Sequence, residues 1–471
     1  MNMTKVSLAG CLVAGITSVT ALGAAFPDKN GSHDLTDPAA WDGVWPQTSN
    51  VRMDNGGTFN CNTQDATFTG IWPNAKNVVI TNNPGRTITL NGSNILYPYN
   101  GGVTMELRGG TWNFSGKNSQ IGDGNKTKFT LSGGVKILNC GTLSGRTGTA
   151  TGDHALEVKD AGTEVTAASL SSAYAHEVAY NEDGTPDQTG VVIDVHDGAR
   201  MSLAGFQTSG GWMLVRGDDT LIAVTSTYFR VGGSNMGCGL HVTDGAVITH
   251  QGTYLILQED SGDYLGKTLV DNGGSLTTSG TIELGAWGTT HHGNLLIAGL
   301  NGTVQVGGVY GKNVNNWLVA SNGTLTVTGH CQIDVADEDK HTTGIRIAGH
   351  KPKFVAGRCT IYRIALEWNL PDRPYETTGA LIEAGSYTTS TLRYSINGLA
   401  DFVKAIPETT EVVLMEATAA DGVVPESPSE IARVNALLDA EAPGSRIYRT
   451  TDGKKLILHA KKKKGLAIIF R

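Results

Sequence analysis

Few ionisable residues in this chain stand close enough together in sequence to suggest chemistry. The strongest fragments are Arg216-Gly217-Asp218-Asp219, His291-His292-Gly293 and Arg346-Ile347-Ala348. Two carboxylates can divide the acid and base roles of glycoside hydrolysis when both face one substrate. The fragments lie about 73 and 54 residues apart, so their side chains would have to be brought together by the fold. We interpret Gly217-Asp218-Asp219 as a corner turn and assign no catalytic residue.

An acidic cluster at Asp334, Asp337, Glu338 and Asp339 is the one weak candidate for a metal site. Carboxylate oxygens are the ligands that Ca²⁺ prefers. The spacing has neither the order of an EF-hand loop nor a glycine-rich nonapeptide repeat, so a solvated acidic loop is the preferred interpretation. The sequence also lacks C-x-x-C and H-E-x-x-H pairs, which are typical of zinc sites. We therefore expect no metal and no cofactor.

The end of the chain carries a run of positive charge. Residues 451–471 contain seven Lys or Arg residues, including Lys461, Lys462, Lys463 and Lys464, against Asp452 as the one acidic residue. Such a patch can hold an anionic polymer or a lipid surface. Lysines also protect a strand edge from aggregation, and this alternative stays open.

Three tryptophans are candidates for contact with carbohydrate. Trp212, Trp287 and Trp317 would offer flat apolar faces to sugar rings if they were exposed. Tryptophan is also a common core residue, so packing inside the fold is the alternative.

Composition excludes several classes of protein. Of 471 residues, 62 are Gly and 17% are charged, and the net charge is −8. There is no G-X-Y period, which excludes collagen, and an apolar fraction of 39% is too high for a disordered acidic chain. No internal apolar run reaches the roughly 18 residues that a membrane-spanning helix needs. An acidic exported chain also argues against nucleic acid as a partner.

The first 25 residues have the form of a secretory signal peptide. Lys5 is followed by the apolar run 6–22, and Gly23 and Ala25 are the small residues expected before a cleavage site. Leu8-Ala9-Gly10-Cys11 leaves a lipoprotein signal as the alternative, although only five residues separate Lys5 from Cys11. We expect a bacterial protein that is secreted or held at the cell surface.

The cysteines beyond this segment are widely spaced and too few for a dense disulfide scaffold. Cys331 and Cys359 share the frame Gly-x-Cys-x-Ile. If these two segments stack in register, their Cα atoms lie about 4.8 Å apart, which is within disulfide range. A buried pair of thiols is the preferred interpretation, and a disulfide is the alternative.

Residues 50–370 form a string of short segments in which apolar residues alternate with polar ones, as in β-strands. Asp-Gly or Asn-Gly pairs punctuate them, and glycines 245, 273, 302 and 323 are 28, 29 and 21 residues apart. Recurrence at this period is typical of solenoids and propellers, and the unit is short for a four-stranded propeller blade. We predict an all-β protein whose residues 51–397 form a single-coil parallel β-helix. A β-sandwich built on ordinary hairpins is the alternative.

Both ends of such a solenoid need covers, because an open end exposes strand edges and core. Residues 26–50, with Trp41, Trp45 and several prolines, are the predicted N-terminal cap. Residues 398–471 are the predicted C-terminal α/β cap. There, Ser427-Pro428-Ser429-Glu430 has the form of a capping box and predicts a helix at about 428–440. The basic segment from residue 446 onward is expected to add terminal strands.

These features together resemble autotransporter passengers and autotransporter-associated repeat proteins. The resemblance is carried by Trp41-x-Gly43-x-x-Pro46, by rungs of the form D/N-G-x-L-x-V-x-G, and by the closing segment Glu411–Ala417. It implies a right-handed pectin-lyase-like β-helix with a role in adhesion, surface display or polysaccharide contact. The chain lacks the C-terminal series of strands that a membrane barrel would need, so self-translocation is not implied.

The function expected from the sequence is therefore contact rather than chemistry. We expect a monomeric, non-catalytic scaffold, adhesin-like or polysaccharide-binding, whose partner is a polysaccharide or a glycan of the cell envelope or a host surface. The alternative is a carbohydrate-active enzyme of the β-helix type, either a lyase or a glycoside hydrolase. Three or more ionisable side chains that converge in a cleft on neighbouring rungs would favour the enzyme, and a polar but uncharged face would favour the scaffold.

Overall fold

The computed structural model describes most of the chain beyond residue 33. The described residues are 34–41, 50–53, 56–74, 77–93, 95–96, 102–123, 128–147, 155–174, 191–209, 211–231, 238–257, 266–284, 294–311, 316–334 and 343–462. The predicted signal peptide at 1–25 lies outside these residues, as do Trp45, Trp287, His291 and His292.

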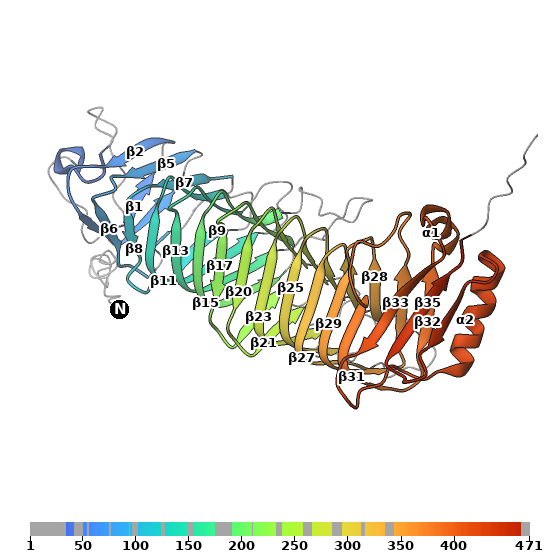
Figure 1. Ribbon diagram of the computed structural model, residues 1–471. Coiled ribbons are helices and arrows are strands. Elements are labelled where there is room, and N and C mark those ends of the chain that lie inside the picture. Colours follow the sequence, from blue (N-terminus) through green and yellow to red (C-terminus); the bar gives the residue numbers. More distant parts are fainter. Residues whose placement is uncertain are drawn as a thin grey trace, which may run out of the picture.

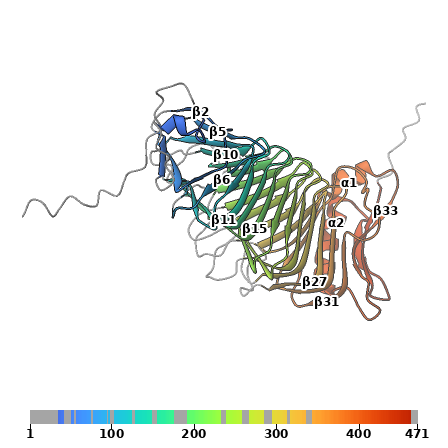
Figure 2. The ribbon, with the colours of Figure 1, turned by 90° about the vertical axis from the view of Figure 1, so that its left-hand side faces the viewer.

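The chain winds into stacked coils that form one elongated rod, as Figure 1 and Figure 2 show. Within the described residues, each coil contributes one strand to a fourteen-stranded sheet, here called the long sheet, whose pairings are parallel. This arrangement is a parallel β-solenoid, so the β-sandwich alternative is wrong. The strands of the long sheet are β2 (Gly57–Cys61), β5 (Val78–Asn82), β7 (Thr104–Arg108), β10 (Lys128–Ser132), β12 (Leu156–Lys159), β14 (Val191–His196), β16 (Gly211–Arg216), β19 (Cys238–Thr243), β22 (Gly266–Val270), β24 (Asn294–Ala298), β26 (Asn316–Ser321), β28 (Gly344–Ala348), β30 (Ala365–Asn369) and β32 (Arg393–Asn397).

After a tight corner, each coil continues into a second sheet, here called the bent sheet. Its parallel strands are β3 (Ala66–Phe68), β6 (Thr87–Leu90), β8 (Thr111–Asn113), β9 (Ser119–Asp123), β11 (Lys136–Thr147), β13 (Glu164–Tyr174), β15 (Arg200–Ser209), β17 (Leu221–Val224), β18 (Tyr228–Val231), β20 (Val247–His250), β21 (Tyr254–Leu257), β23 (Ser275–Leu284), β25 (Thr303–Gly311), β27 (Thr324–Asp334), β29 (Lys353–Tyr362), β31 (Ile382–Thr389) and β33 (Thr410–Ala417).

The pairings of β15, β17, β20, β23, β21 and β18 close into a ring. β15 and β23 each continue around a corner as one strand. In the two coils between them the same corner interrupts the strand, which gives β17 and β18 in one coil and β20 and β21 in the next. Every one of these pairings is parallel and joins neighbouring coils, so the ring is a gap within the bent sheet.

The Asp-Gly and Asn-Gly corners take the conformation that their residue types favour. Asp244 has φ 54° and Gly245 has φ 82°, and Asn272 and Gly273 repeat the pair with 45° and 82°. Short polar side chains and glycine tolerate this left-handed region far better than other residues. Asn301 and Asn322 keep this conformation at the next two corners, with φ 54° and 60°, whereas Gly302 and Gly323 do not adopt it.

Inside the rod, alternate side chains of each strand stack in columns along its axis. One column runs through Ile248, Leu276, Val304, Leu325 and Phe354, which are paired in register on five successive coils and fully buried. A single coil could not remove these side chains from water, so stacking supplies the hydrophobic stabilisation of the fold.

At the N-terminal end, the short 3-10 helix Pro38–Trp41 precedes β1 (Asn50–Met53), which pairs in parallel with β4 (Gly70–Pro73). Asp34 bridges to Asn60 of the first long-sheet strand, and its carboxylate accepts hydrogen bonds from Thr36 and from Thr63. The described part of the predicted N-terminal cap thus lies against the first coil.

The C-terminal end mixes strands and helices, and Figure 1 shows both α1 and α2 at this end of the rod. Helix α2 (Pro428–Glu441) covers the range for which the sequence predicts a helix, whereas α1 (Leu399–Ala405) was not predicted. Strand β33 still pairs in parallel with β31, and then β35 (Lys455–Ala460) and β34 (Arg446–Arg449) add antiparallel strands. The bent sheet therefore extends beyond the predicted boundary at residue 397.

The predicted capping box at the start of α2 is wrong in its details. Ser427 is the N-cap residue, but its side chain makes no capping hydrogen bond. Glu430 instead accepts a hydrogen bond from the backbone N–H of Tyr394 in β32, at 2.7 Å, and another from Arg433. The carboxylate is drawn toward the strand edge because that N–H belongs to the last strand of the long sheet. Within the described residues, no helix has the length and apolar character needed to cross a bilayer.

Candidate functional site

The three predicted sugar-contacting tryptophans do not form a common surface. Trp212 is fully buried, and its ring lies directly against Gly239 of the next coil, where an added Cβ would come within 2.2 Å of the indole. Its proposed contact with sugar is therefore wrong, because no face of the ring is open. Trp317 is half-buried, with the guanidinium carbon of Arg346 at 4.3 Å from its ring centroid. Trp287 lies outside the described residues.

The basic tail is only partly described, and one of its lysines is held by backbone contacts. Lys462 donates from Nζ to the carbonyl of Lys404 at 2.7 Å, and from its backbone N–H to Thr409 Oγ1 at 3.2 Å. Lys461 is exposed and donates its backbone N–H to Ser445. Lys463 and Lys464 lie outside the described residues, so the anionic-polymer patch stays a prediction.

The calcium candidates fall at the edge of the described structure. Asp334 ends β27, while Asp337 and Asp339 lie outside the described residues. Among the residues that the structure describes, no group of three His, Cys, Asp or Glu side chains could hold a metal ion.

The fragments with catalytic residue types do not converge. Arg216 is in β16 and Arg346 is in β28, and β19, β22, β24 and β26 separate these two strands in the long sheet. At about 4.8 Å per coil this places them over 20 Å apart. Each is occupied locally: Arg216 donates to Asp194 at 2.9 Å, and Arg346 donates to Glu367 at 3.1 Å. Asp219 occupies a left-handed corner with φ 62°, in line with the turn interpretation.

The outer face of the long sheet carries a charged ladder that the sequence analysis missed. Four outward-pointing residues are paired in register on successive strands of the long sheet. In order they are Glu106, Thr130, Glu157 and Asp194. His196 joins them from the next outward position, with Nε2 at 3.3 Å from Glu157 and Nδ1 at 2.9 Å from Asp197. The sequence signal was the alternation in β12 and β14, where charged residues fill the positions between core residues.

Cations pair with these carboxylates throughout the ladder. Lys128 and Lys159 each place Nζ at 3.3 Å from Glu157, which also accepts from His196. The hydrogen bond to His196 is the largest cause that holds the pKa of Glu157 far below its usual value, against the opposing effect of burial. The same bond raises the pKa of His196 above its usual value. The described groups form ion pairs along the sheet, an arrangement that stabilises the stack.

One facet of the bent sheet has the opposite character and is polar without charge. Thr249, Thr277, Gln305 and Thr326 follow one another in register on four successive coils. A second column, two residues before the first in each strand, consists of Ser275, Thr303 and Thr324. All seven side chains are exposed or half-buried. We call these seven residues the hydroxyl facet, and it presents hydrogen-bonding groups at the coil repeat of about 4.8 Å.

Two tyrosines stand beside the first coil of this facet. Tyr254 follows Thr249 across the corner formed by residues 251–253, and Tyr228 lies on the preceding coil. Tyr228 and Tyr254 are paired on neighbouring coils, with ring centroids 5.7 Å apart and planes inclined by 15°. Tyr228 is 45% exposed, and the guanidinium carbon of Arg230 lies 5.1 Å from its ring centroid. This pair was not predicted, although Tyr-x-x-Val at 228 and Tyr-x-x-Leu at 254 occupy equivalent positions in consecutive repeats.

Comparison with known proteins yields no family model, no curated protein and no solved structure that matches this chain.

Proposed function

We propose that this protein is an exported bacterial β-solenoid that binds a neutral polysaccharide without cleaving it. The proposal includes the signal peptide, a secreted or cell-surface location, a monomeric state and a right-handed coil, with α1 and α2 acting as the C-terminal cap. Its ligand would be a glycan of an envelope, a host surface or the surrounding medium.

The stacked Tyr228–Tyr254 pair, in which Tyr228 is exposed and Tyr254 is half-buried, is the observation that carries the proposal. Aromatic rings combine a flat apolar face with a polar hydroxyl, and this suits a sugar ring, which has a C–H face and a rim of hydroxyl groups. The two rings stack on each other on neighbouring coils, so the second ring repeats the first along the rod axis.

The hydroxyl facet supports the same function and indicates the class of glycan. Thr, Ser and Gln side chains both donate and accept hydrogen bonds, as sugar hydroxyls do. Each such bond contributes little alone because it replaces a bond to water, but a repeating polymer engages many at once. The facet has no charged member, so a neutral polysaccharide fits it better than an anionic one.

The experiment is a binding titration of the full chain against soluble neutral and anionic polysaccharides. Replacing both tyrosines by alanine (Y228A/Y254A) should weaken binding of the neutral ligand at least tenfold, by analogy with the roughly 1–3 kcal/mol lost per stacked base when an aromatic is truncated. Tyr362→Ala, at a half-buried position several coils away on the same sheet, is the matched control. Equal affinity of the double variant and the wild type would contradict the proposal.

The charged ladder favours a second candidate, a β-helix carbohydrate-active enzyme. Glu157, Asp194 and His196 lie on two neighbouring coils, close enough together for an acid and a base group to reach one substrate. Asp194 is 1% exposed and bonded to Arg216, however, and Glu157 is bonded to His196. Assays for reducing ends and for unsaturated products distinguish the two functions, because turnover that is lost in Glu157→Gln would establish the enzyme.

A further inference from the structure

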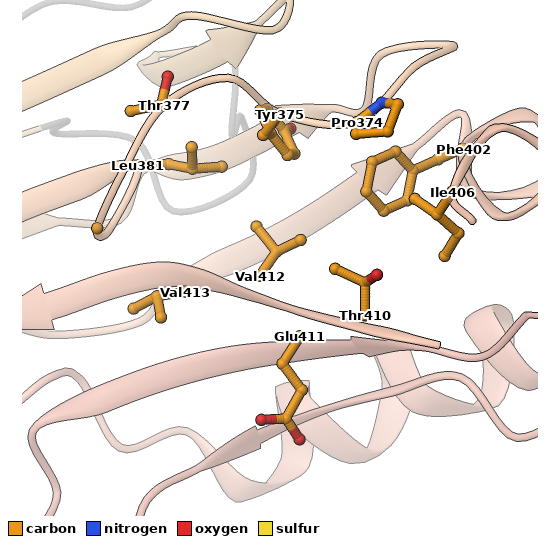
Figure 3. Close-up of a pocket in the computed structure, with 11 residues that line it drawn as sticks. Pro374, Tyr375, Thr377, Leu381, Phe402, Ile406, Thr410, Glu411, Val412 and Val413 are labelled. Carbon is orange, nitrogen blue, oxygen red and sulfur yellow. The ribbon is translucent and has the colours of Figure 1, made fainter. Parts of the chain in front are cut away.

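A groove lies at the C-terminal end of the rod, where the last strands meet α1. It has a volume of about 280 Å³ and is mainly apolar. Figure 3 shows three sets of side chains around it, from the segment before β31, from the region of α1, and from the beginning of β33. Its lining includes Tyr375, Leu381, Phe402, Ile406, Thr410 and Val412.

The floor of the groove is a strand with one partly unpaired edge. On one side, β33 pairs with β35 from Thr410 to Glu416. On the other side, its described pairing with β31 begins at Met415, preceded by the bond from Leu381 N–H to the carbonyl of Val413. Within the described residues, the segment from Thr410 to Val412 therefore has one edge toward the groove. Such an edge is a site at which an extended segment can add as a further strand.

A buried polar atom also lacks a partner at this place. The hydroxyl group of Tyr375 is buried and makes no hydrogen bond among the described residues. A buried hydroxyl without a partner costs free energy. An occupant that brings backbone carbonyl groups into the groove would satisfy it, whereas a purely apolar molecule would not.

The described chain ends beside this groove. Strand β35 finishes at Ala460, opposite Thr410, and Lys462 then bonds to Thr409 and to Lys404 at the end of α1. The chain has thus reached the start of β33 by residue 462. The residues that follow read Lys463-Lys464-Gly465 and then Leu466-Ala467-Ile468-Ile469-Phe470-Arg471. This apolar, strand-favouring run would be an aggregation hazard if it stayed exposed.

We propose that residues 466–470 of the same chain bind in this groove as an additional strand beside Thr410–Val412. Three residues, 463–465, span about 10 Å when extended, which is enough to pass around the start of β33. The first three of these apolar residues then cover about 10 Å beside Thr410–Val412, where the edge ends because Leu381 bonds to Val413. They run parallel to β33 because β35 approaches in the antiparallel sense. Their alternate side chains fill the apolar groove, and their backbone supplies an acceptor for Tyr375.

Charge supports this path. Glu408 is exposed just before the strand. Glu411 is half exposed, but its carboxylate accepts a hydrogen bond from Tyr448 and pairs with His459. The two lysines at 463 and 464 pass Glu408 if the tail takes the proposed route. The positive charge of these lysines then favours the path that brings the following strand to the groove. This binding of the tail is independent of polysaccharide binding.

Hydrogen exchange of the full chain tests the proposal. Aspartate at two positions of the tail (I468D/I469D) should expel it from the groove, and valine at the same positions (I468V/I469V) is the matched control that keeps its apolar character. Amides of residues 410–412 that face away from β35 should exchange at least about tenfold faster in the aspartate variant than in the wild type. A synthetic peptide of residues 463–471 should restore slow exchange in the aspartate variant and leave the wild type unchanged.

Two outcomes would overturn the proposal. Equal exchange rates in the wild type and the aspartate variant would mean that the tail does not occupy the groove. Protection that grows with protein concentration, together with a dimer in light scattering, would assign the groove to the tail of a second copy.

Discussion

Cys331 and Cys359 lie opposite each other on β27 and β29, and both are buried free thiols. The disulfide considered from the sequence is not formed, although the two residues are paired in register. Side chains at paired positions of a parallel sheet point the same way, so the two thiols stack. The hydrogen bond between them, followed by burial, raises the pKa of Cys331 well above its usual value.

The first prediction is that these two thiols resist alkylation in the folded protein. The thiolate is the reactive form. Burial shields both side chains from the reagent, and the raised pKa of Cys331 keeps its thiolate scarce. Alkylation of the native chain at pH 8, mapped by peptide mass spectrometry, should leave Cys331 and Cys359 unmodified, and both should react fully in denaturant. Rapid modification of either residue in the native protein would show that the coils open there.

The second prediction separates two glycines that look alike in sequence. Gly273 has φ 82°, and an added Cβ would make only ordinary contacts, 3.8 Å from the backbone nitrogen of Gly245, so Gly273→Ala strains only the backbone, at about 1–2 kcal/mol. Gly302 also follows an asparagine, but an added Cβ would lie 1.9 Å from the carbonyl oxygen of Val270. Gly302→Ala must shift backbone and should cost more than Gly273→Ala.

Urea unfolding of the two alanine variants checks this order. Asn272→Gly is the control, because glycine takes its φ of 45° without strain, and it should stay close to the wild type. The reverse order of the two alanine variants would mean that coil contacts at Gly302 relax without cost.

The third prediction concerns pH. His196 has a raised pKa because it bonds to Glu157 and lies near Asp194. Its contribution to stability is fully present below about pH 6.5, the unfolded value, and is lost as the pH rises through the folded pKa. Glu157 has a lowered pKa, so its contribution is present above about pH 4.3 and is lost in stronger acid.

Unfolding midpoints of the wild type and His196→Gln, measured from pH 5 to 9, test this sign. The advantage of the wild type should be largest near pH 5–6 and should shrink as the pH rises. An advantage that grows with pH would contradict the assigned Glu157–His196 bond.

How much of the fold the sequence predicts depends on how local the signal is. Asp244-Gly245 and Asn272-Gly273 encode their corners through their own φ preferences, and the alternation around Leu276 encodes a strand that buries one face. These signals repeat, so the stacked coils were predictable. Helix α1 was not, because seven residues are too few to show a helical period and its buried Leu399 and Phe402 depend on tertiary packing.

The candidate site was harder to predict because it depends on register. Glu157 and His196 are 39 residues apart in sequence, and only the pairing of β12 with β14 shows that they meet. Tyr228 and Tyr254 are likewise aligned by pairing of β18 with β21. Trp212 seemed a better ligand contact by residue type, but Gly239 on the next coil gives its ring a place to pack, and no pattern within one repeat reveals that.

The fourth prediction follows from the hydrogen bonds at the start of α2. A capping box would make Ser427 the important residue, and its replacement by alanine would cost about 1 kcal/mol. The structure gives Ser427 no side-chain bond, while Glu430 accepts from Tyr394 N–H and pairs with Arg433. Ser427→Ala should therefore stay within about 0.5 kcal/mol of the wild type. Glu430→Ala should lose about 2 kcal/mol, the worth of a hydrogen bond to a charged group.

Denaturant unfolding of both variants, monitored by tryptophan fluorescence, measures these differences. Glu430→Gln tests the contribution of the charge, because glutamine keeps an acceptor oxygen and removes the negative charge. Since Glu430 joins α2 to the last strand of the long sheet, its loss should also speed hydrogen exchange at Tyr394. If exchange at Tyr394 became faster in Ser427→Ala but stayed unchanged in Glu430→Ala, Ser427 would be the capping residue. Glu430 would then not be the group that holds the first turn of α2 to the edge of the long sheet.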